Sequence, residues 1–283
     1  MKVEILKPKA YCAGVSNAIK LAYKAREENP NKKVYVLGML VHNNFVVDEL
    51  KKKDIQVALD INEIPDGEGE VIIFSAHGHK KELDQIAKTK KLIIYDSVCP
   101  KVLSNMKLIE ENIKEGHNVI YIGQKGHPEA EACLSLHNKV MLFTNNLLNN
   151  YQVEKDQEPL VINQTTLSIL DIQDIHKAIL DAIPGARIAN EICGSTRLRQ
   201  EAILSLDKDV DLIIVVGDNN SSNTKRLLEV AKASHPEVES IMISDASALD
   251  ISVCANKNHI VISSGASTPE DIIDAVYNKI VNY

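Results

Sequence analysis

Three cysteines divide this chain of 283 residues into three parts of similar length. Cys99 follows Cys12 by 87 residues (99 − 12), and Cys193 follows Cys99 by 94 residues (193 − 99). Two polar positions recur after each cysteine at similar offsets: the first set is His42, His127 and Ser221, and the second set is His77, Thr165 and Ser267. The repeat predicts three related units, although its period exceeds the roughly 20–50 residues of familiar repeat proteins.

Short apolar runs rich in β-branched residues precede these polar positions and predict buried strands. The runs are residues 34–37, 71–74, 119–122, 160–162, 212–216 and 260–262, and two more strands are predicted at 2–6 and 92–95. Helical segments alternate with the strands, which is typical of parallel sheets with polar residues gathered at their carboxyl ends. We therefore predict an α/β protein of three similar small domains with mainly parallel sheets and inward-facing sites. The predicted bounds are 13–98, 99–192 and 193–283, after an N-terminal strand segment at 1–12.

Each repeated cysteine directly precedes a predicted helix. Cys99 is followed by Pro100, which suits the first helical position and places Cys99 at the N-cap. The positive end of a helix stabilises a thiolate, and thiolates bind metal ions. The repeat thus makes Cys12, Cys99 and Cys193 candidate metal ligands. Cys133 and Cys254 have no equivalents and are expected to be structural.

The composition limits the compartment and the partners. A formal charge of −7 argues against nucleic acid as the main partner, because phosphate backbones are bound by dense Lys and Arg. The longest apolar run, 212–216, is far shorter than the roughly 20 residues of a membrane helix. Charges in residues 1–10 interrupt the apolar region that a signal peptide needs. We expect a cytoplasmic protein without a membrane partner, in which cysteines are free thiols or metal ligands.

Two kinds of metal centre compete on the residues alone. Zinc would complete the three cysteines with a histidine, whereas an iron–sulfur cluster would be held by the thiolates. A cluster with three thiolate ligands leaves one iron open to substrate, which suits catalysis. No Cys-x-x-Cys pair occurs, so neither a zinc ribbon nor a bacterial ferredoxin is indicated. A single cysteine is often just a small buried hydrophobic residue, and only the repeat favours metal binding.

The polar residues at the strand ends are candidate anion ligands. His42, His77 and His127 can donate hydrogen bonds to an anion, although a lone strand-end histidine is more often structural. A second group is typical of helix caps, and the same helix ends bind phosphate. This group is Ser221, Ser222, Asn223 and Ser267. If three such helix ends converge, they would hold a diphosphate.

One acidic residue stands beside these candidates. Glu129 lies two residues beyond His127 and is either a general acid or a first-turn acid favoured by the helix dipole. Asp96 and Glu191 precede cysteines and can point away from the site.

Short motifs along essentially the whole chain resemble those of one enzyme family. They are Cys12-Ala13-Gly14-Val15, Val41-His42-Asn43, Phe74-Ser75-Ala76-His77-Gly78, Asp96-Ser97-Val98-Cys99-Pro100, Gly126-His127-Pro128-Glu129, Gln164-Thr165-Thr166-Leu167-Ser168, Cys193 with Thr196 and Arg199-Gln200, Asn220-Ser221-Ser222-Asn223, and Gly265-Ala266-Ser267. The family is that of the 4-hydroxy-3-methylbut-2-enyl diphosphate reductases, which catalyse the last step of the non-mevalonate isoprenoid pathway.

The resemblance implies a site as well as a fold. It implies three α/β domains in a pseudo-threefold arrangement around one 4Fe–4S cluster, held by Cys12, Cys99 and Cys193 and with one open iron site. The substrate hydroxyl would bind this iron, and polar residues would bind the substrate. The implied substrate-binding residues are His42, His77, His127, Thr165, Ser221, Ser222, Asn223 and Ser267. Glu129, helped by Thr165, would be the proton source that converts the hydroxyl into leaving water.

The implied reaction uses two electrons, delivered one at a time by ferredoxin or flavodoxin, and yields isopentenyl and dimethylallyl diphosphate. The expected partners are thus a small diphosphate substrate and this electron donor, and the chain is expected to be a monomer.

Two rival functions remain open on the residues. A zinc hydrolase would use His42, His77 and His127 as ligands and Glu129 as base, but it leaves the three matched cysteines unexplained. A non-catalytic cluster protein that senses redox state or transfers electrons explains the cysteines but not the phosphate-type donors. A brown colour after anaerobic purification would separate the cluster interpretations from zinc.

Overall fold

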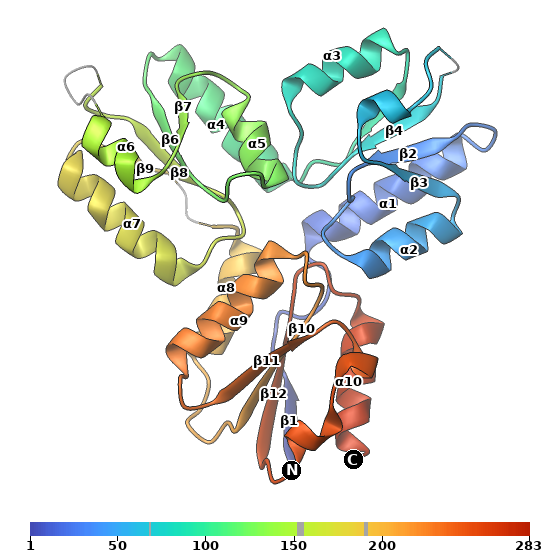
Figure 1. The fold of residues 1–283 in the computed structure, drawn as a ribbon, viewed down its shortest axis with the longest axis vertical. Coiled ribbons are helices and arrows are strands. Elements are labelled where there is room, and N and C mark those ends of the chain that lie inside the picture. Colours follow the sequence, from blue (N-terminus) through green and yellow to red (C-terminus); the bar gives the residue numbers. More distant parts are fainter. Residues whose placement is uncertain (68, 152–155, 190–191) are drawn as a thin grey trace.

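The computed structural model describes residues 1–67, 69–151, 156–189 and 192–283. Within these residues the strands form three sheets of four strands each. Every described strand pair is parallel. The sheets and their helices stand as three lobes around a common centre (Figure 1). The predicted fold class of three similar α/β units in a pseudo-threefold arrangement is confirmed.

The first lobe contains a sheet with the strand order β3-β2-β4-β5. Its strands are β2 (Val34–Leu37), β3 (Ile55–Ala58), β4 (Val71–Phe74) and β5 (Ile93–Asp96). Its helices are α1 (Ala13–Glu28), α2 (Asn44–Lys52) and α3 (Lys81–Thr89), with a 3-10 turn at Ile61–Glu63. The Asn43 side chain accepts hydrogen bonds from the backbone N–H groups of Phe45 and Val46, which fixes the start of α2.

The second lobe repeats this order as β7-β6-β8-β9. Its strands are β6 (Val119–Ile122), β7 (Val140–Leu142), β8 (Leu160–Asn163) and β9 (Arg187–Ile188). Its helices are α4 (Pro100–Lys114), α5 (Pro128–Leu134), α6 (Asn145–Asn150) and α7 (Ile169–Ala182). Proline is the first residue of both α4 and α5. Its fixed φ suits the first helical turn, and it lacks only a backbone N–H that would have no partner within the helix.

The third lobe takes one strand from the beginning of the chain. Its sheet order is β1-β12-β10-β11, and β1 (Lys2–Ile5) pairs in parallel with β12 (His259–Ser264). The other strands are β10 (Leu212–Val216) and β11 (Glu239–Ile243). The helices are α8 (Gly194–Leu204), α9 (Ser222–Ser234) and α10 (Glu270–Val281), with 3-10 turns at Ala246–Ala248 and Ile251–Cys254. The segment predicted as a separate strand at 1–12 thus contributes the fourth strand of this sheet.

Each sheet is covered by apolar packing on both faces. In the first lobe Val34 and Val36 belong to one buried cluster, whereas Tyr35 and Phe74 belong to another on the opposite face. The other two sheets are likewise flanked by two buried clusters each. Strands buried on both faces read as continuous apolar runs, which is why β4, β6, β8 and β10 could be predicted. Among the described residues, no helix combines the length and apolarity needed to cross a membrane.

Candidate functional site

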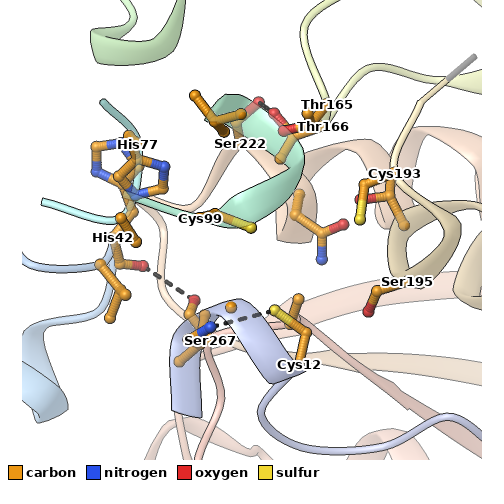
Figure 2. A pocket seen from close by; sticks show the side chains of 18 of the residues that line it. Cys12, His42, His77, Cys99, Thr165, Thr166, Cys193, Ser195, Ser222 and Ser267 are labelled. Atoms are coloured by element: carbon orange, nitrogen blue, oxygen red, sulfur yellow. Dashed lines mark hydrogen bonds between the residues drawn. The ribbon is translucent and has the colours of Figure 1, made fainter. Parts of the chain in front are cut away.

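The three repeated cysteines converge on one cavity where the lobes meet (Figure 2). Cys12, Cys99 and Cys193 occupy the N-cap positions of α1, α4 and α8, as predicted for helix starts. All three are free thiols. The cavity measures about 90 Å³, several times the roughly 10–15 Å³ that one water needs, so a small ligand can enter it.

Backbone hydrogen bonds tie each cysteine to a strand end in the same way. The N–H groups of Cys12, Cys99 and Cys193 donate to the carbonyl oxygens of Ala266 (3.0 Å), Ala76 (3.0 Å) and Thr165 (3.2 Å) respectively. These acceptors lie two residues past β12, β4 and β8 (266 − 264, 76 − 74, 165 − 163). Thr166, rather than the predicted Thr165, is therefore the structural equivalent of His77 and Ser267. Thr165 and Thr166 both line the cavity.

The other repeated set is equivalent as predicted. His42, His127 and Ser221 each lie five residues past a strand, namely β2, β6 and β10 (42 − 37, 127 − 122, 221 − 216). All three line the cavity.

The cysteine side of the cavity fits a group held between sulfur atoms. Gly14 lies in the first turn of α1, and a Cβ atom at this position would stand 2.7 Å from the Cys99 Sγ and 3.8 Å from the Cys12 Sγ. The absence of a side chain thus leaves room between two of the candidate ligand sulfurs. Cys133 and Cys254 are buried in apolar clusters, in agreement with the structural role expected for them.

The electrostatics at Cys99 differ from the expected thiolate. Burial raises the pKa of the Cys99 thiol, although backbone hydrogen bonds from Lys101 and Val102 at the start of α4 act to lower it. The helix start is present as predicted, but its stabilisation of the thiolate is weaker than the cost of desolvation. Metal ligation requires the thiolate, so metal binding at this site must displace the Cys99 proton.

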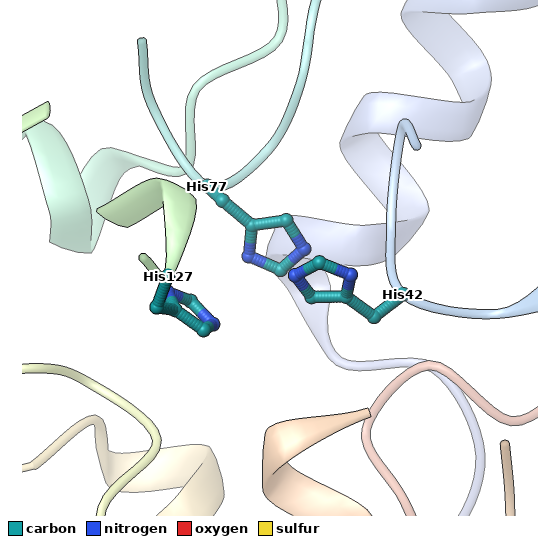
Figure 3. Close-up of side chains that lie close together, drawn as sticks. All are labelled: His42, His77 and His127. Carbon is teal, nitrogen blue, oxygen red and sulfur yellow. The ribbon is translucent and has the colours of Figure 1, made fainter. Parts of the chain in front are cut away.

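Three histidines form another wall of the cavity, and their side chains lie close together (Figure 3). The rings of His42 and His77 stack at 4.2 Å between centroids, and His127 meets them edge-on at 5.4 and 5.5 Å. Their ring nitrogens lie within 4.8 Å of one another. Burial lowers the pKa of each ring, that of His127 to about 4, so the rings are neutral near pH 7. Each Nε2 is buried and has no hydrogen-bond partner among the described residues.

The polar residues of the third lobe separate into capping and unpartnered groups. The Ser221 hydroxyl caps α9 by accepting from the Thr224 N–H at 3.2 Å. The Ser222 hydroxyl accepts from Thr166 at 3.3 Å, across the boundary between lobes. Neither side-chain polar atom of buried Asn223 has a partner among the described residues. Buried polar groups are rarely left unpaired, so Asn223 and the three histidines point to a missing polar ligand.

Ser267 links two lobes at the same cavity. Its hydroxyl donates to the His42 carbonyl oxygen at 3.3 Å, which joins the third lobe to the first. The structure therefore brings together all the predicted substrate-binding and metal-binding residues around one space.

Glu129 is a buried acidic residue that contacts Thr165 at the edge of the cavity. It is 1% exposed, and its carboxylate accepts from the Thr165 hydroxyl at 2.7 Å, the Thr165 N–H at 2.9 Å and the Tyr121 hydroxyl at 3.4 Å. Burial raises its pKa to about 7, against the lowering effect of the Thr165 hydrogen bonds. Thr165 lines the cavity and Glu129 does not, so the acid meets the cavity through the threonine hydroxyl.

Other lining residues had weaker signals in the sequence. The cavity is also lined by residues from the starts of α4 and α8, namely Lys101, Ser195 and Thr196. Each lies two or three residues after Cys99 or Cys193, and this closeness could have indicated a place in the site. Asp96 is exposed and accepts from the Val98 N–H at 3.0 Å, so it points away as expected. Glu191 lies outside the described residues.

Several known enzymes are similar to this chain over almost its whole length. A protein from Brevibacillus brevis named 4-hydroxy-3-methylbut-2-enyl diphosphate reductase is 36% identical over 285 residues, covering 98% of this chain and 90% of the relative. A protein of the same name from Malacoplasma penetrans is 33% identical over 281 residues, with 95% and 93% coverage.

Solved structures agree with these relatives. The E-1-hydroxy-2-methyl-but-2-enyl-4-diphosphate reductase of Plasmodium falciparum superposes with a TM-score of 0.91 at 30% identity, covering 98% of this chain and 87% of that one. A structure of (E)-4-hydroxy-3-methyl-but-2-enyl diphosphate reductase, described as the terminal enzyme of the non-mevalonate pathway, gives a TM-score of 0.72 at 29% identity and full coverage of both chains. The sequence pattern described as LytB protein matches residues 3–281, and this chain belongs to the LytB protein family.

Proposed function

We propose that this protein is a 4-hydroxy-3-methylbut-2-enyl diphosphate reductase. The observation that carries the proposal is one cavity that has three free cysteines on one side and, on the other, buried histidine and asparagine nitrogens without a partner among the described residues. The reaction breaks one C–O bond and forms one C–H bond. Two electrons and two protons enter, water leaves, and the products are isopentenyl diphosphate and dimethylallyl diphosphate.

Cys12, Cys99 and Cys193 would hold one 4Fe–4S cluster. Three free thiols at helix starts and the space left by Gly14 support this assignment. When bound, such a cluster supplies electrons and one open iron site for the substrate oxygen. The same three residues would have to lose their protons on loading.

The substrate diphosphate would bind at the histidine wall. The Nε2 atoms of His42, His77 and His127 have no other partner among the described residues, and neutral imidazole can donate from this nitrogen. The Asn223 amide offers two further donors. Ser221, Ser222 and Ser267 place hydroxyl groups in the same cavity, beside the start of α9. This ligand would satisfy the buried polar atoms that the described part of the chain leaves unpaired.

Proton delivery would pass through Thr165. A carboxyl group with a pKa of about 7 is substantially protonated at neutral pH, which suits a general acid. When the Thr165 hydroxyl turns its own proton toward the cavity, it can accept a hydrogen bond from protonated Glu129 and relay that proton. Leaving oxygen at an allylic carbon would then depart as water. Tyr121 and the Thr165 N–H hold the Glu129 carboxylate in place.

We further propose that ferredoxin or flavodoxin supplies the electrons, one at a time, and that the protein works as a cytoplasmic monomer. The zinc alternative remains poorer, because the three histidines would bind zinc while the matched cysteines had no role. A purely electron-transferring cluster protein would not need the unpartnered donors of the histidine wall.

An anaerobic preparation tests the proposal directly. Iron, sulfide and visible absorbance should show one cluster per chain, and reduced methyl viologen with the diphosphate substrate should give both products. Cys99→Ser should lose most of the cluster, whereas Cys254→Ser, a matched change in an apolar core, should keep it. Full cluster content in Cys99→Ser, or bound zinc in place of iron, would falsify the assignment.

A further inference from the structure

Arg199 is a buried cation at the edge of the cysteine site. Arg199 lies on α8 and is only 2% exposed. Its nitrogens donate to the carbonyl oxygens of Ser264 (3.2 Å), Ser195 (3.1 Å) and Ala10 (2.6 Å), and also to the Ser195 hydroxyl. Every one of these acceptors is neutral. Within the described residues no carboxylate pairs with this guanidinium.

A buried charge without a counter-charge is unfavourable, and proteins normally pair it. A purely structural role explains part of the arrangement, because the hydrogen bonds hold the loop before Cys12 against the start of α8. Neutral acceptors do not require a charged donor, however. The position therefore calls for a negative group that the described residues do not provide.

The hydrogen bonds place Arg199 beside two cluster ligands. Ala10 lies two residues before Cys12, and Ser195 lies two residues after Cys193 and lines the cavity (Figure 2). Burial lowers the pKa of Arg199, whereas Cys12 and Cys193 act to raise it when their sulfurs are ionised. Metal-bound thiolates at these two positions would therefore be the negative groups nearest to this cation. Guanidinium stays charged at any working pH.

We propose that Arg199 is the buried counter-charge of the cluster held by Cys12, Cys99 and Cys193, and that it raises the reduction potential of that cluster. The inference rests on the proposed function, since it assumes the cluster. Three thiolates make the site negative, and an added electron makes it more so. A fixed positive charge stabilises the reduced form more than the oxidised form. Net charge and hydrogen bonding around the ligands are known to set the potentials of such clusters.

The test compares three variants of the cluster-loaded protein. Arg199→Gln removes the charge and keeps some hydrogen bonding, and Arg199→Lys keeps the charge but loses the forked geometry. Arg197→Gln is the matched control, because it removes the same charge from a half-exposed position on the same helix. The measurement is a redox titration followed by the paramagnetic signal of the reduced cluster, with iron and sulfide content determined first. Iron content of the unaltered protein tests the cluster itself, separately from Arg199.

We expect Arg199→Gln to lower the ratio of reduced to oxidised cluster at fixed potential about tenfold, which is about 59 mV for one electron. Arg199→Lys and Arg197→Gln should stay close to the unaltered protein. Loss of the cluster from Arg199→Gln but not from Arg199→Lys would also support a need for the charge. An unchanged potential in loaded Arg199→Gln would overturn the proposal. So would an equal shift, or equal cluster loss, in Arg199→Lys, because the role would then be structural.

Discussion

At the scale of single residues, Glu129 differs most from an ordinary carboxyl group. It is buried, it accepts three hydrogen bonds, and its pKa is raised to about 7 by burial. Protonation therefore dominates below about pH 7, and the anion dominates above. A general acid in this setting donates well at neutral pH and loses this ability as the pH rises.

Replacing this acid should stop turnover without emptying the site. Glu129→Gln keeps the shape but cannot donate the proton, so turnover should fall about 100-fold or more while cluster content and substrate affinity persist. In the unaltered enzyme the rate should decline as the pH rises above about 7, and the variant should not show this decline. Glu131→Gln, on the exposed side of α5, is the control and should behave normally. Turnover within a few-fold of normal would assign proton donation to the substrate diphosphate or to water beside Thr165.

The diphosphate assignment is tested at Asn223 and His42. Asn223→Ala or His42→Ala should weaken substrate binding by about 1–3 kcal/mol, because each removes one donor to a charged group. Binding measured by calorimetry on the loaded protein gives this value directly. Asn220→Ala changes an exposed neighbour and should leave the affinity intact. If both variants bind substrate with normal affinity, these residues have structural roles and do not bind the diphosphate.

Counting along the chain found residues that line one cavity, but it did not predict the directions of their side chains. Cys12, Cys99 and Cys193 recur because each precedes a helix that starts at the centre, and helix starts can be predicted. The position of Glu129 behind Thr165 could not be predicted, since it depends on side-chain rotamers at a boundary between elements. The unpartnered nitrogens of the histidines are equally invisible in the sequence, because only packing determines which atoms are satisfied.

At the scale of elements, the central strands were predictable and several edge strands were not. Strands β3, β7, β9 and β11 lie at sheet edges and escaped prediction. An edge strand is exposed on one side and needs no continuous apolar run; β9 is only two residues long and exposed.

The first turn of α1 offers a test at this scale. Gly14→Ala should reduce cluster content, because the added Cβ would stand 2.7 Å from the Cys99 Sγ and must push the sulfur aside. Gly194→Ala is the matched control at the start of α8, where an added Cβ meets nothing within 4 Å. It should keep the cluster and stabilise the protein by about 0.4–1 kcal/mol in chemical unfolding. Equal cluster content in the two variants would contradict the close approach at Gly14.

At the scale of the whole molecule, we propose that residues 13–98, 99–192 and 193–283, the last with β1, behave as three domains. Among the described residues, the side chains that link them include site residues, as in the contacts of Ser267 with His42 and of Thr166 with Ser222. Another link is Asp218, which accepts from the Asn44 N–H at 2.8 Å and so holds the third lobe against the start of α2.

Gln200 makes the most complete of these links. Fully buried on α8, it accepts from the Ile169 N–H at 2.8 Å and donates to the Leu167 carbonyl at 2.9 Å in the second lobe. Gln200→Ala should lower the free energy of unfolding by about 1–3 kcal/mol for each polar group left unpaired. Urea unfolding measures this loss, and Glu201→Ala on the exposed side of α8 should change it by less than about 1 kcal/mol. A Gln200 variant as stable as the control would mean that solvent reaches the interface.

The pairing of β1 with β12 has a consequence during synthesis. Residues 2–5 leave the ribosome long before residues 259–262, their partners in the sheet. At roughly 5–20 residues per second, the delay is on the order of ten to fifty seconds. Throughout this time β1 is an unpaired strand attached to a first lobe that can already fold. The loop that carries Cys12 is therefore among the first parts of the site to be made and among the last to be fixed, and we expect the site to be complete only after residues 259–262 have been made.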